Sequence, residues 1–228
     1  MRKSMVALLA GAMLMMATSA MAIPTLRLTD GFTTIDIADG SALDANGLLG
    51  GVTYIGSVGS NWTLNVATGV TKPFQGTALV PYMDLNSVNS SAGAGSLEIL
   101  FSETGFVVNP AVSGFTTHVG GTTQGTFEVK SFFDTNNVLF GKPLTGALAD
   151  LGPYATGSFA GTEVNSAAFG TNQNYSLTLD AIITHAGLGT TSFDAQLTPV
   201  PEPGTMMLLG IGMLGMAIYG KRRMNKEA

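Results

Sequence analysis

The 228-residue sequence contains no cysteine, only one tryptophan and only two histidines. The absence of cysteine excludes a disulfide framework and thiol chemistry. The sequence also lacks the HExxH metal-binding motif, the GxSxG nucleophile motif and a phosphate-binding glycine loop. No enzymatic motif therefore stands out in the sequence.

Cations are scarce in the middle of the chain. Between Ile23 and Pro199 there are four lysines and arginines against thirteen aspartates and glutamates. This excess of negative charge argues against nucleic acid or an anionic polysaccharide as an electrostatic partner. Divalent cations could still bridge such a surface to an acidic matrix.

Long helical periods are also missing between residues 23 and 199. Short runs of alternating apolar residues stand there instead, separated by Gly, Asn, Ser and Thr, as in "YSLTLDAIIT" and "TTSFDAQL". The predicted apolar faces of these two runs are Leu177, Leu179, Ala181 and Ile183, then Phe193, Ala195 and Leu197. The pattern predicts one all-β domain over residues 23–199, an antiparallel, jelly-roll-like β-sandwich whose last strand ends at about Leu197. A β-solenoid is the alternative, but the sequence has no fixed repeat.

The N-terminal residues have the layout of an export signal. A basic start, Arg2-Lys3, precedes an apolar run over residues 5–17, and Ala20-Met21-Ala22 follows. This order predicts a secretory signal peptide over residues 1–22, which serves the Sec export machinery and which signal peptidase removes before Ile23. An uncleaved membrane anchor is the alternative, although the apolar run is short for a span.

Near the C-terminus, prolines alternate at positions 199, 201 and 203. Each proline fixes φ and lacks a backbone donor, and each preceding residue is pushed toward extended conformations. The segment is therefore predicted to join neither a helix nor a central strand, and to project from the domain as a stiff, accessible peptide. An ordinary proline linker would have the same composition.

An uncharged apolar run follows from Thr205 to Tyr219. As a helix it would cover roughly 22 Å, short of a ~30 Å hydrocarbon core, but flanking glycines and snorkelling cations can extend it. We expect a single transmembrane helix over residues 205–220 and a basic cytoplasmic segment over residues 221–226, which leaves the body outside the cytoplasm. The stop-transfer charges are Lys221, Arg222 and Arg223.

The order Val200-Pro201-Glu202-Pro203-Gly204, apolar helix, Lys221-Arg222-Arg223 resembles the PEP-CTERM sorting signal of Gram-negative bacteria. The resemblance covers residues 200–226 only. It implies export, transient anchoring in the inner membrane, and processing by an exosortase, a membrane enzyme comparable in role to a sortase. It also implies a place at the cell surface or in the extracellular matrix, associated with exopolysaccharide and biofilm. The residues that the exosortase would recognise are Val200, Pro201, Glu202, Pro203 and Gly204.

The stretch "DIADGSALD" is a candidate calcium loop, because it gathers Asp36, Asp39 and Asp44 around a glycine. It lacks the alternate-position oxygens of an EF-hand loop, and a plain acidic turn is the alternative. Two glutamates, Glu98 and Glu128, are the candidates for a glycosidase pair. Both occupy the polar side of an alternating strand, where a solvated carboxylate is the ordinary expectation.

Aromatic residues are the remaining candidates for contacts with sugars. Trp62 shares a strand face with apolar residues, so we expect it to be buried, whereas the tyrosines at positions 54, 82, 154 and 175 are freer candidates. His185 is predicted to lie in a polar turn. The sequence thus favours an exported surface or matrix protein that acts by binding or by structure, in its specific form a glycan-binding module or adhesin. A secreted glycan-active hydrolase is the alternative.

Overall fold

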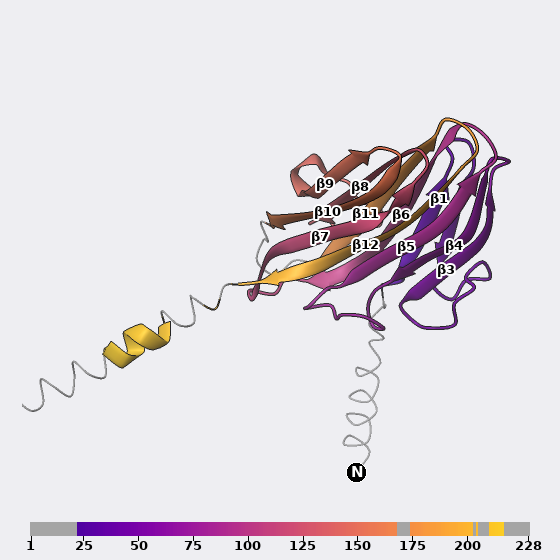
Figure 1. Cartoon of the computed structure of the whole chain (residues 1–228). Helices are drawn as coiled ribbons and strands as arrows, with labels where there is room; N and C mark the ends of the chain where they lie inside the picture. The colour runs from indigo at the N-terminus through magenta and orange to yellow at the C-terminus, as the bar shows by residue number, and fades with distance from the viewer. Residues whose placement is uncertain (1–21, 168–173, 203, 205–209, 217–228) are drawn as a thin grey trace, which may run out of the picture.

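The structure, a computed structural model, describes residues 22–167, 174–202, 204 and 210–216 (Figure 1). Two antiparallel six-stranded sheets pack face to face around one core. The first sheet contains, in spatial order, β2 (Thr34–Ala38), β1 (Thr25–Thr29), β6 (Gly95–Val107), β11 (Asn174–His185), β8 (Thr126–Asp134) and β9 (Ala147–Tyr154). The second contains β10 (Gly157–Ser166), β7 (Val112–Thr123), β12 (Gly189–Pro201), β5 (Met83–Ser91), β4 (Trp62–Val70) and β3 (Gly51–Val58). The predicted antiparallel β-sandwich is confirmed.

Most connections from β5 onwards cross from one sheet to the other. Strands β5, β6, β7 and β8 alternate between the sheets, and so do β9, β10, β11 and β12. The connection between β8 and β9 stays within the first sheet and contains a short 3-10 helix, η1 (Leu144–Gly146). This wrapping is typical of a jelly roll.

The core follows directly from the alternation in the sequence. Successive side chains of a strand point to opposite faces, so one face of each strand meets the other sheet. All seven residues predicted for the apolar faces of β11 and β12 are buried. Trp62 at the start of β4 is also buried, as predicted.

The connection between β8 and β9 folds back over the outer face of the first sheet. The Phe140 N–H donates to Ser102 Oγ over 2.9 Å, and Ser176 Oγ donates to the Val138 carbonyl over 2.6 Å. The Arg27 guanidinium lies 4.2 Å from the centre of the Phe140 ring. Polar residues on the outer side of β6 and β11 are therefore buried beneath this loop.

One end of the sandwich gathers the first described residues and the end of β12, along the lower side in Figure 1. We call it the terminal end. Backbone hydrogen bonds join the segments that form it, and among them the Asp39 N–H donates to the Pro24 carbonyl over 3.0 Å. The terminal end comprises residues 22–24, 39–50, 71–82, 103–111 and 198–202.

The two predicted membrane segments fall largely outside the described residues. Of the signal peptide, with its cleavage site at Ala20 and Ala22, the structure describes Ala22 alone. Of the predicted transmembrane helix, it describes residues 210–216, which are helical and exposed. Within the described part of the chain, no helix has the length and the apolar character needed to cross a bilayer.

Candidate functional site

The proline-rich segment does not project from the domain where the sequence predicted it would. Strand β12 continues through Pro201, and Pro199, Val200 and Pro201 pair with Phe115, Gly114 and Val112 of β7. The expected strand end at about Leu197 is therefore wrong by four residues. The domain also extends two residues beyond the predicted boundary at residue 199.

Strand geometry explains how β12 tolerates two prolines. The Glu202 N–H donates to the Ala111 carbonyl over 2.8 Å, and the Val200 carbonyl accepts from Ser113 Oγ over 3.2 Å, so both backbone groups face β7. Because backbone groups alternate in direction along a strand, the nitrogens of Pro199 and Pro201 face the opposite side. Pairing with β5 ends there, at Leu197, so no ladder bond is lost.

The accessible part of the sorting segment begins later than the prolines suggest. Val200 is half-buried, whereas Pro201, Glu202 and Gly204 are exposed. Pro203 and the stop-transfer charges Lys221, Arg222 and Arg223 lie outside the described residues. Glu202 is thus the first residue of the motif that lies beyond the strand and is open to a partner.

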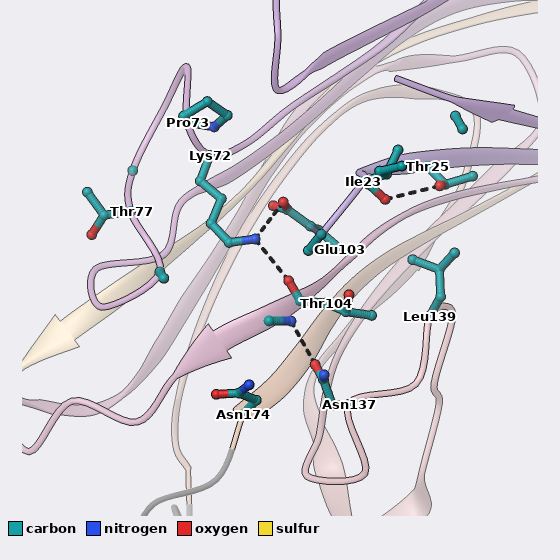
Figure 2. A pocket seen from close by; sticks show the side chains of 15 residues that line it. Ile23, Thr25, Lys72, Pro73, Thr77, Glu103, Thr104, Asn137, Leu139 and Asn174 are labelled. Atoms are coloured by element: carbon teal, nitrogen blue, oxygen red, sulfur yellow. Dashed lines mark hydrogen bonds and ion pairs between the residues drawn. The ribbon is translucent and has the colours of Figure 1, made fainter. Parts of the chain in front are cut away.

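A cavity of about 910 Å³ opens at the terminal end (Figure 2). Its size is typical of a site for a small molecule. The cavity is lined by the start of the described chain, the β4–β5 connection, the end of β6 and the β8–β9 connection. Its polar lining residues are Thr25, Lys72, Thr77, Glu103, Thr104, Asn137 and Asn174.

The charged centre of the cavity is the ion pair between Lys72 and Glu103. Lys72 Nζ lies 2.5 Å from Glu103 Oε1 and donates to the Thr104 carbonyl over 2.9 Å (Figure 2). Thr71 Oγ1 donates to the other carboxylate oxygen over 2.8 Å. Lys72 Nζ also lies 4.4 Å from the centre of the Phe106 ring. These contacts hold both charged groups at fixed positions.

Burial controls the protonation of this pair. Desolvation raises the pKa of Glu103 to about 7, although the hydrogen bond and charge of Lys72 lower it. Desolvation likewise lowers the pKa of Lys72, against the opposing effect of Glu103. The Glu103 carboxyl can therefore exchange a proton near neutral pH.

Sequence reasoning missed this pair, yet one signal for it was present. In "SLEILFSE" the residues Leu97, Ile99 and Phe101 occupy the core-facing positions, and Glu103 is the next position on the same face. A carboxylate at a core-facing position of a strand needs a buried partner. Which cation would supply it was not predictable, because Lys72 lies on a distant connection.

The remaining polar groups suit a ligand with many hydroxyl groups. Asn174 is exposed at the start of β11, and Thr77 is exposed on the β4–β5 connection. Asn137 Oδ1 already accepts from the Gly105 N–H over 2.7 Å, and Thr77 Oγ1 accepts from the Val80 N–H over 3.0 Å but keeps its hydroxyl proton to donate. Amides and hydroxyls of this kind can both donate and accept hydrogen bonds. The cavity wall can thus both donate hydrogen bonds to a ligand and accept them from it.

The four candidate tyrosines do not form a platform for stacking sugars. Tyr54 and Tyr175 are buried, and the Tyr54 hydroxyl donates to the Ser57 carbonyl over 2.9 Å. Tyr82 and Tyr154 are half-buried, and Tyr154 stacks on Phe159 with ring centres 5.0 Å apart. The prediction that Tyr54 and Tyr175 are freer than Trp62 is therefore wrong.

Each of the two candidate catalytic glutamates is bound to a lysine. Glu128 on β8 lies 2.6 Å from Lys130, and Glu98 on β6 lies 2.7 Å from Lys142, with β11 between the two strands. The structure thus places these glutamates in two separate ion pairs.

The neighbour of Glu98 that sequence reasoning missed is Asp180 on β11. Its Oδ2 lies 3.1 Å from Lys142 Nζ. Burial raises the pKa of Asp180 to about 6, against the attraction of Lys142. Asp180 occupies a polar position of its strand, but the β8–β9 connection covers it.

The three aspartates of the candidate calcium loop do not converge. Asp36 makes a two-pronged ion pair with Arg27, in which both oxygen–nitrogen distances are 2.7 Å. Asp39 accepts from the Gly50 N–H over 2.7 Å, and Asp44 accepts backbone N–H groups within its own loop. Among the described residues, no three acidic or histidine side chains cluster as metal ligands would. The loop is held by hydrogen bonds to its own backbone, as expected for an acidic turn.

The predicted turn position of His185 is wrong. His185 is the last residue of β11 and is buried, with its ring 5.0 Å from that of Trp62. Its two ring nitrogens lie 2.7 Å from Ser91 Oγ and 2.9 Å from Thr191 Oγ1. Burial lowers its pKa. These contacts assign His185 a role in packing.

Residues 199–223 match the PEP-CTERM protein-sorting motif. The resemblance noted from the sequence is therefore confirmed for this segment. PEP-CTERM proteins are exported and sorted to the cell surface, and the motif implies processing by an exosortase. The match covers the C-terminal tail and not the β-sandwich.

No curated protein matches the chain. Among solved structures, the chain is similar to the enzymatically active domain of tailspike protein 4 from bacteriophage CBA120, with 14% identity and a TM-score of 0.32. That similarity covers 62% of this chain and 20% of the tailspike chain, so the chain spans about a fifth of its length. A CBM4 structure is similar over 47% of this chain and 84% of its own, with 15% identity and a TM-score of 0.28. Neither likeness carries an argument about function.

Proposed function

We propose that this chain is an exported cell-surface or extracellular-matrix protein, held transiently in the inner membrane by its tail and processed there by an exosortase. The observation that carries the proposal is the PEP-CTERM motif at residues 199–223, which begins within the last strand of the domain. Signal peptidase and the Sec machinery act at the other end of the chain. The β-sandwich, in this proposal, acts by binding or by structure and not by catalysis.

The geometry at the end of β12 supports the role of the motif as a substrate. Glu202 is exposed and adjoins the exposed Pro201, so a membrane enzyme can reach both residues. The strand fixes Val200 and Pro201 in an extended conformation, the form in which proteases and transpeptidases bind their substrates.

Replacement of Pro201, Glu202 and Pro203 by alanine tests the sorting role. Export and anchoring should persist, because neither the apolar run nor the stop-transfer charges change. Processing should fail, and the full-length form should accumulate in the inner membrane of a host that carries the exosortase. The measurement is the C-terminal mass of the protein and its distribution among cell fractions.

The control for this triple variant is Pro199→Ala. It changes a proline in the same strand but leaves the Pro-Glu-Pro motif intact. It should mature at the wild-type rate. If the triple variant also matured at that rate, the proline motif would be only a linker and the proposed sorting role would be wrong.

For the body, we infer a binding role for the cavity at the terminal end, with a glycan as the proposed ligand. The support is a volume of about 910 Å³ with exposed amide and hydroxyl groups on its wall. An uncharged sugar fits this wall better than an acidic one, because Glu103 offsets the charge of Lys72 and the body is acidic.

A glycan array followed by calorimetry with the best binder tests this role. The variants Asn174→Ala and Thr77→Ala should weaken binding, because each removes an exposed hydrogen-bonding group from the cavity wall. Thr63→Ala is the matched control, since Thr63 is exposed on β4 away from the cavity. If Asn174→Ala and Thr77→Ala bound the glycan as tightly as the control Thr63→Ala, the cavity would be excluded as the glycan site.

The same experiment separates a binding module from the alternative, a glycan-active hydrolase. A hydrolase would release reducing ends from the bound glycan, and one carboxylate substitution, such as Glu98→Gln, would abolish that release. Binding without turnover supports the proposal. The ion pairs of Glu98 and Glu128 with lysines favour structural roles for both carboxylates.

A further inference from the structure

We propose that the terminal end of the sandwich is a membrane-docking surface, which rests on the outer leaflet of the inner membrane while the tail anchors the chain. The inference rests on the proposed anchoring of the tail and goes beyond it. It assigns a partner, the lipid bilayer, to a surface of the folded domain.

The first observation is a group of exposed apolar side chains on two connections of the terminal end. Each of these side chains is at least half exposed, which is unusual for large apolar residues on one end of a soluble fold. Three lie on the β2–β3 connection and three on the β4–β5 connection: Leu43, Leu48, Leu49, Phe74, Leu79 and Val80. Ile23, beside them, is also more than half exposed.

The second observation is that these connections are fixed to each other. The Thr71 N–H donates to the Gly50 carbonyl over 2.8 Å and joins the β4–β5 connection to the β2–β3 connection. The Gly50 N–H in turn donates to Asp39 Oδ2. The two connections that carry the apolar side chains are therefore held in fixed positions relative to each other.

The same surface is fixed to the exit of the tail. Asn109 Nδ2 donates to the Leu79 carbonyl over 3.0 Å, and the Val107 N–H donates to the Ala78 carbonyl over 2.8 Å. Asn109 belongs to the turn before β7, and Ala111 of that turn accepts from the Glu202 N–H. The apolar surface and the start of the tail thus belong to one rigid part of the domain.

The third observation is the length of chain between the domain and the predicted span. Strand β12 ends at Pro201, and the apolar run begins at Thr205. The three intervening residues reach at most about 10 Å, a few ångströms more than one lipid headgroup layer of roughly 5–8 Å. While the tail is anchored, the terminal end therefore has to lie at the membrane surface.

The start of the chain is consistent with this orientation. Ala22, the last residue of the predicted signal peptide, lines the cavity at the terminal end. Ala22 and the end of β12 therefore both belong to the terminal end, which also carries the exposed apolar residues.

The charges of this surface indicate which lipids it fits. Its cation, Lys72, is bound to Glu103, its acids Asp39 and Asp44 accept backbone hydrogen bonds, and Glu202 is an exposed acid. Without free cations on the described part of this surface, attraction to anionic lipids contributes little. Docking should depend on apolar contact and should respond weakly to salt.

The test uses the full-length chain, which has no cysteine and so accepts a single labelled cysteine without background. Leu48→Cys and Leu79→Cys place a polarity-sensitive fluorophore on the docking surface. Leu188→Cys is the matched control, because Leu188 is an exposed leucine at the opposite end of the sandwich. Each labelled chain is reconstituted into phosphatidylcholine vesicles that contain nitroxide-labelled lipid.

We expect the nitroxide lipid to quench the labels at positions 48 and 79 several-fold more strongly than the label at position 188, at low and at high salt. Equally weak quenching at all three positions, in chains that float with the vesicles, would overturn the docking surface and leave the anchor intact. Chains that fail to float would overturn the anchor itself and the docking inference with it. A further label is placed on Val80→Cys. In that chain, the double substitution Leu48→Glu/Leu79→Glu should reduce the quenching to the level seen at position 188.

Discussion

At the scale of single residues, the cavity is organised by one carboxylate in an unusual place. Glu103 stands at a core-facing position of β6 and is almost completely buried. Lys72 and Thr71 satisfy its two oxygens. An unpaired charge at this position would destabilise the fold by several kcal/mol. The pair is thus a requirement of the fold as well as a feature of the cavity.

The raised pKa of Glu103 predicts a dependence of stability on pH. Between about 4.5 and about 7, the carboxyl is protonated in the folded chain and ionised in the unfolded chain. The folded state therefore binds more protons, and the free energy of unfolding falls as the pH rises through this range, by up to about 3 kcal/mol. Glu103→Gln should remove this part of the slope, measured by denaturant unfolding at several pH values.

The control for Glu103→Gln is Asp150→Asn, which replaces a carboxylate whose side chain is mostly exposed. Asp180, whose pKa burial raises to about 6, contributes a slope of the same sign and remains in both variants. If Glu103→Gln and Asp150→Asn showed the same slope, the carboxyl of Glu103 would not titrate in this range.

At the scale of elements, β12 carries two functions in one strand. Its first nine residues pair with β5, the last seven of these pair with β7 as well, and its last four residues pair with β7 alone. The change from a central to an edge position coincides with the first proline of the sorting segment. The strand can therefore end in a peptide that an enzyme reads without a separate linker.

The direction of the backbone groups in β12 predicts opposite outcomes for two neighbouring substitutions. Val200→Pro removes an N–H that faces β7, and should lower the free energy of unfolding by about 1 kcal/mol or more, the usual net value of a hydrogen bond. Pro199→Val restores an N–H on the open side of β12, the side where pairing with β5 has already ended. This substitution should change the free energy of unfolding by less. Thermal unfolding of the two variants measures the difference, and equal losses would contradict the assignment of the open side.

At the scale of the whole molecule, the position of the tail orients the domain. In the proposed orientation, the sandwich presents its terminal end to the membrane, and the opposite end, with Leu188 and Phe32 in its turns, points away. The predicted topology depends on the cluster of cations after the apolar run, because the span is short for a hydrocarbon core.

Replacement of Lys221, Arg222 and Arg223 by neutral residues should therefore cause a different failure from that of the proline variant. A marginal span without its stop charges should slip through the membrane, and the unprocessed chain should appear in the periplasm. Cell fractionation with detection of the body measures this outcome. Retention of the neutral variant in the inner membrane would show that the apolar run anchors the chain by itself.

Local patterns in the sequence were sufficient for the fold class and for the sorting motif. Alternation with a period of two marks which side chains of a strand face the core, so the faces of β11 and β12 and the burial of Trp62 were predictable. The motif at residues 199–223 was predictable because an enzyme reads it as a short contiguous peptide.

The tertiary structure alone decided which segments meet. The cavity joins Lys72, Glu103 and Asn174 from distant parts of the chain, and Arg27 takes Asp36 away from the candidate calcium loop. The prolines of β12 lie within a strand because pairing with β5 ends before them, which no property of the prolines themselves reveals. The physical reason is that a strand's own sequence specifies its two faces, whereas its neighbours follow from the simultaneous packing of all the strands that the structure describes.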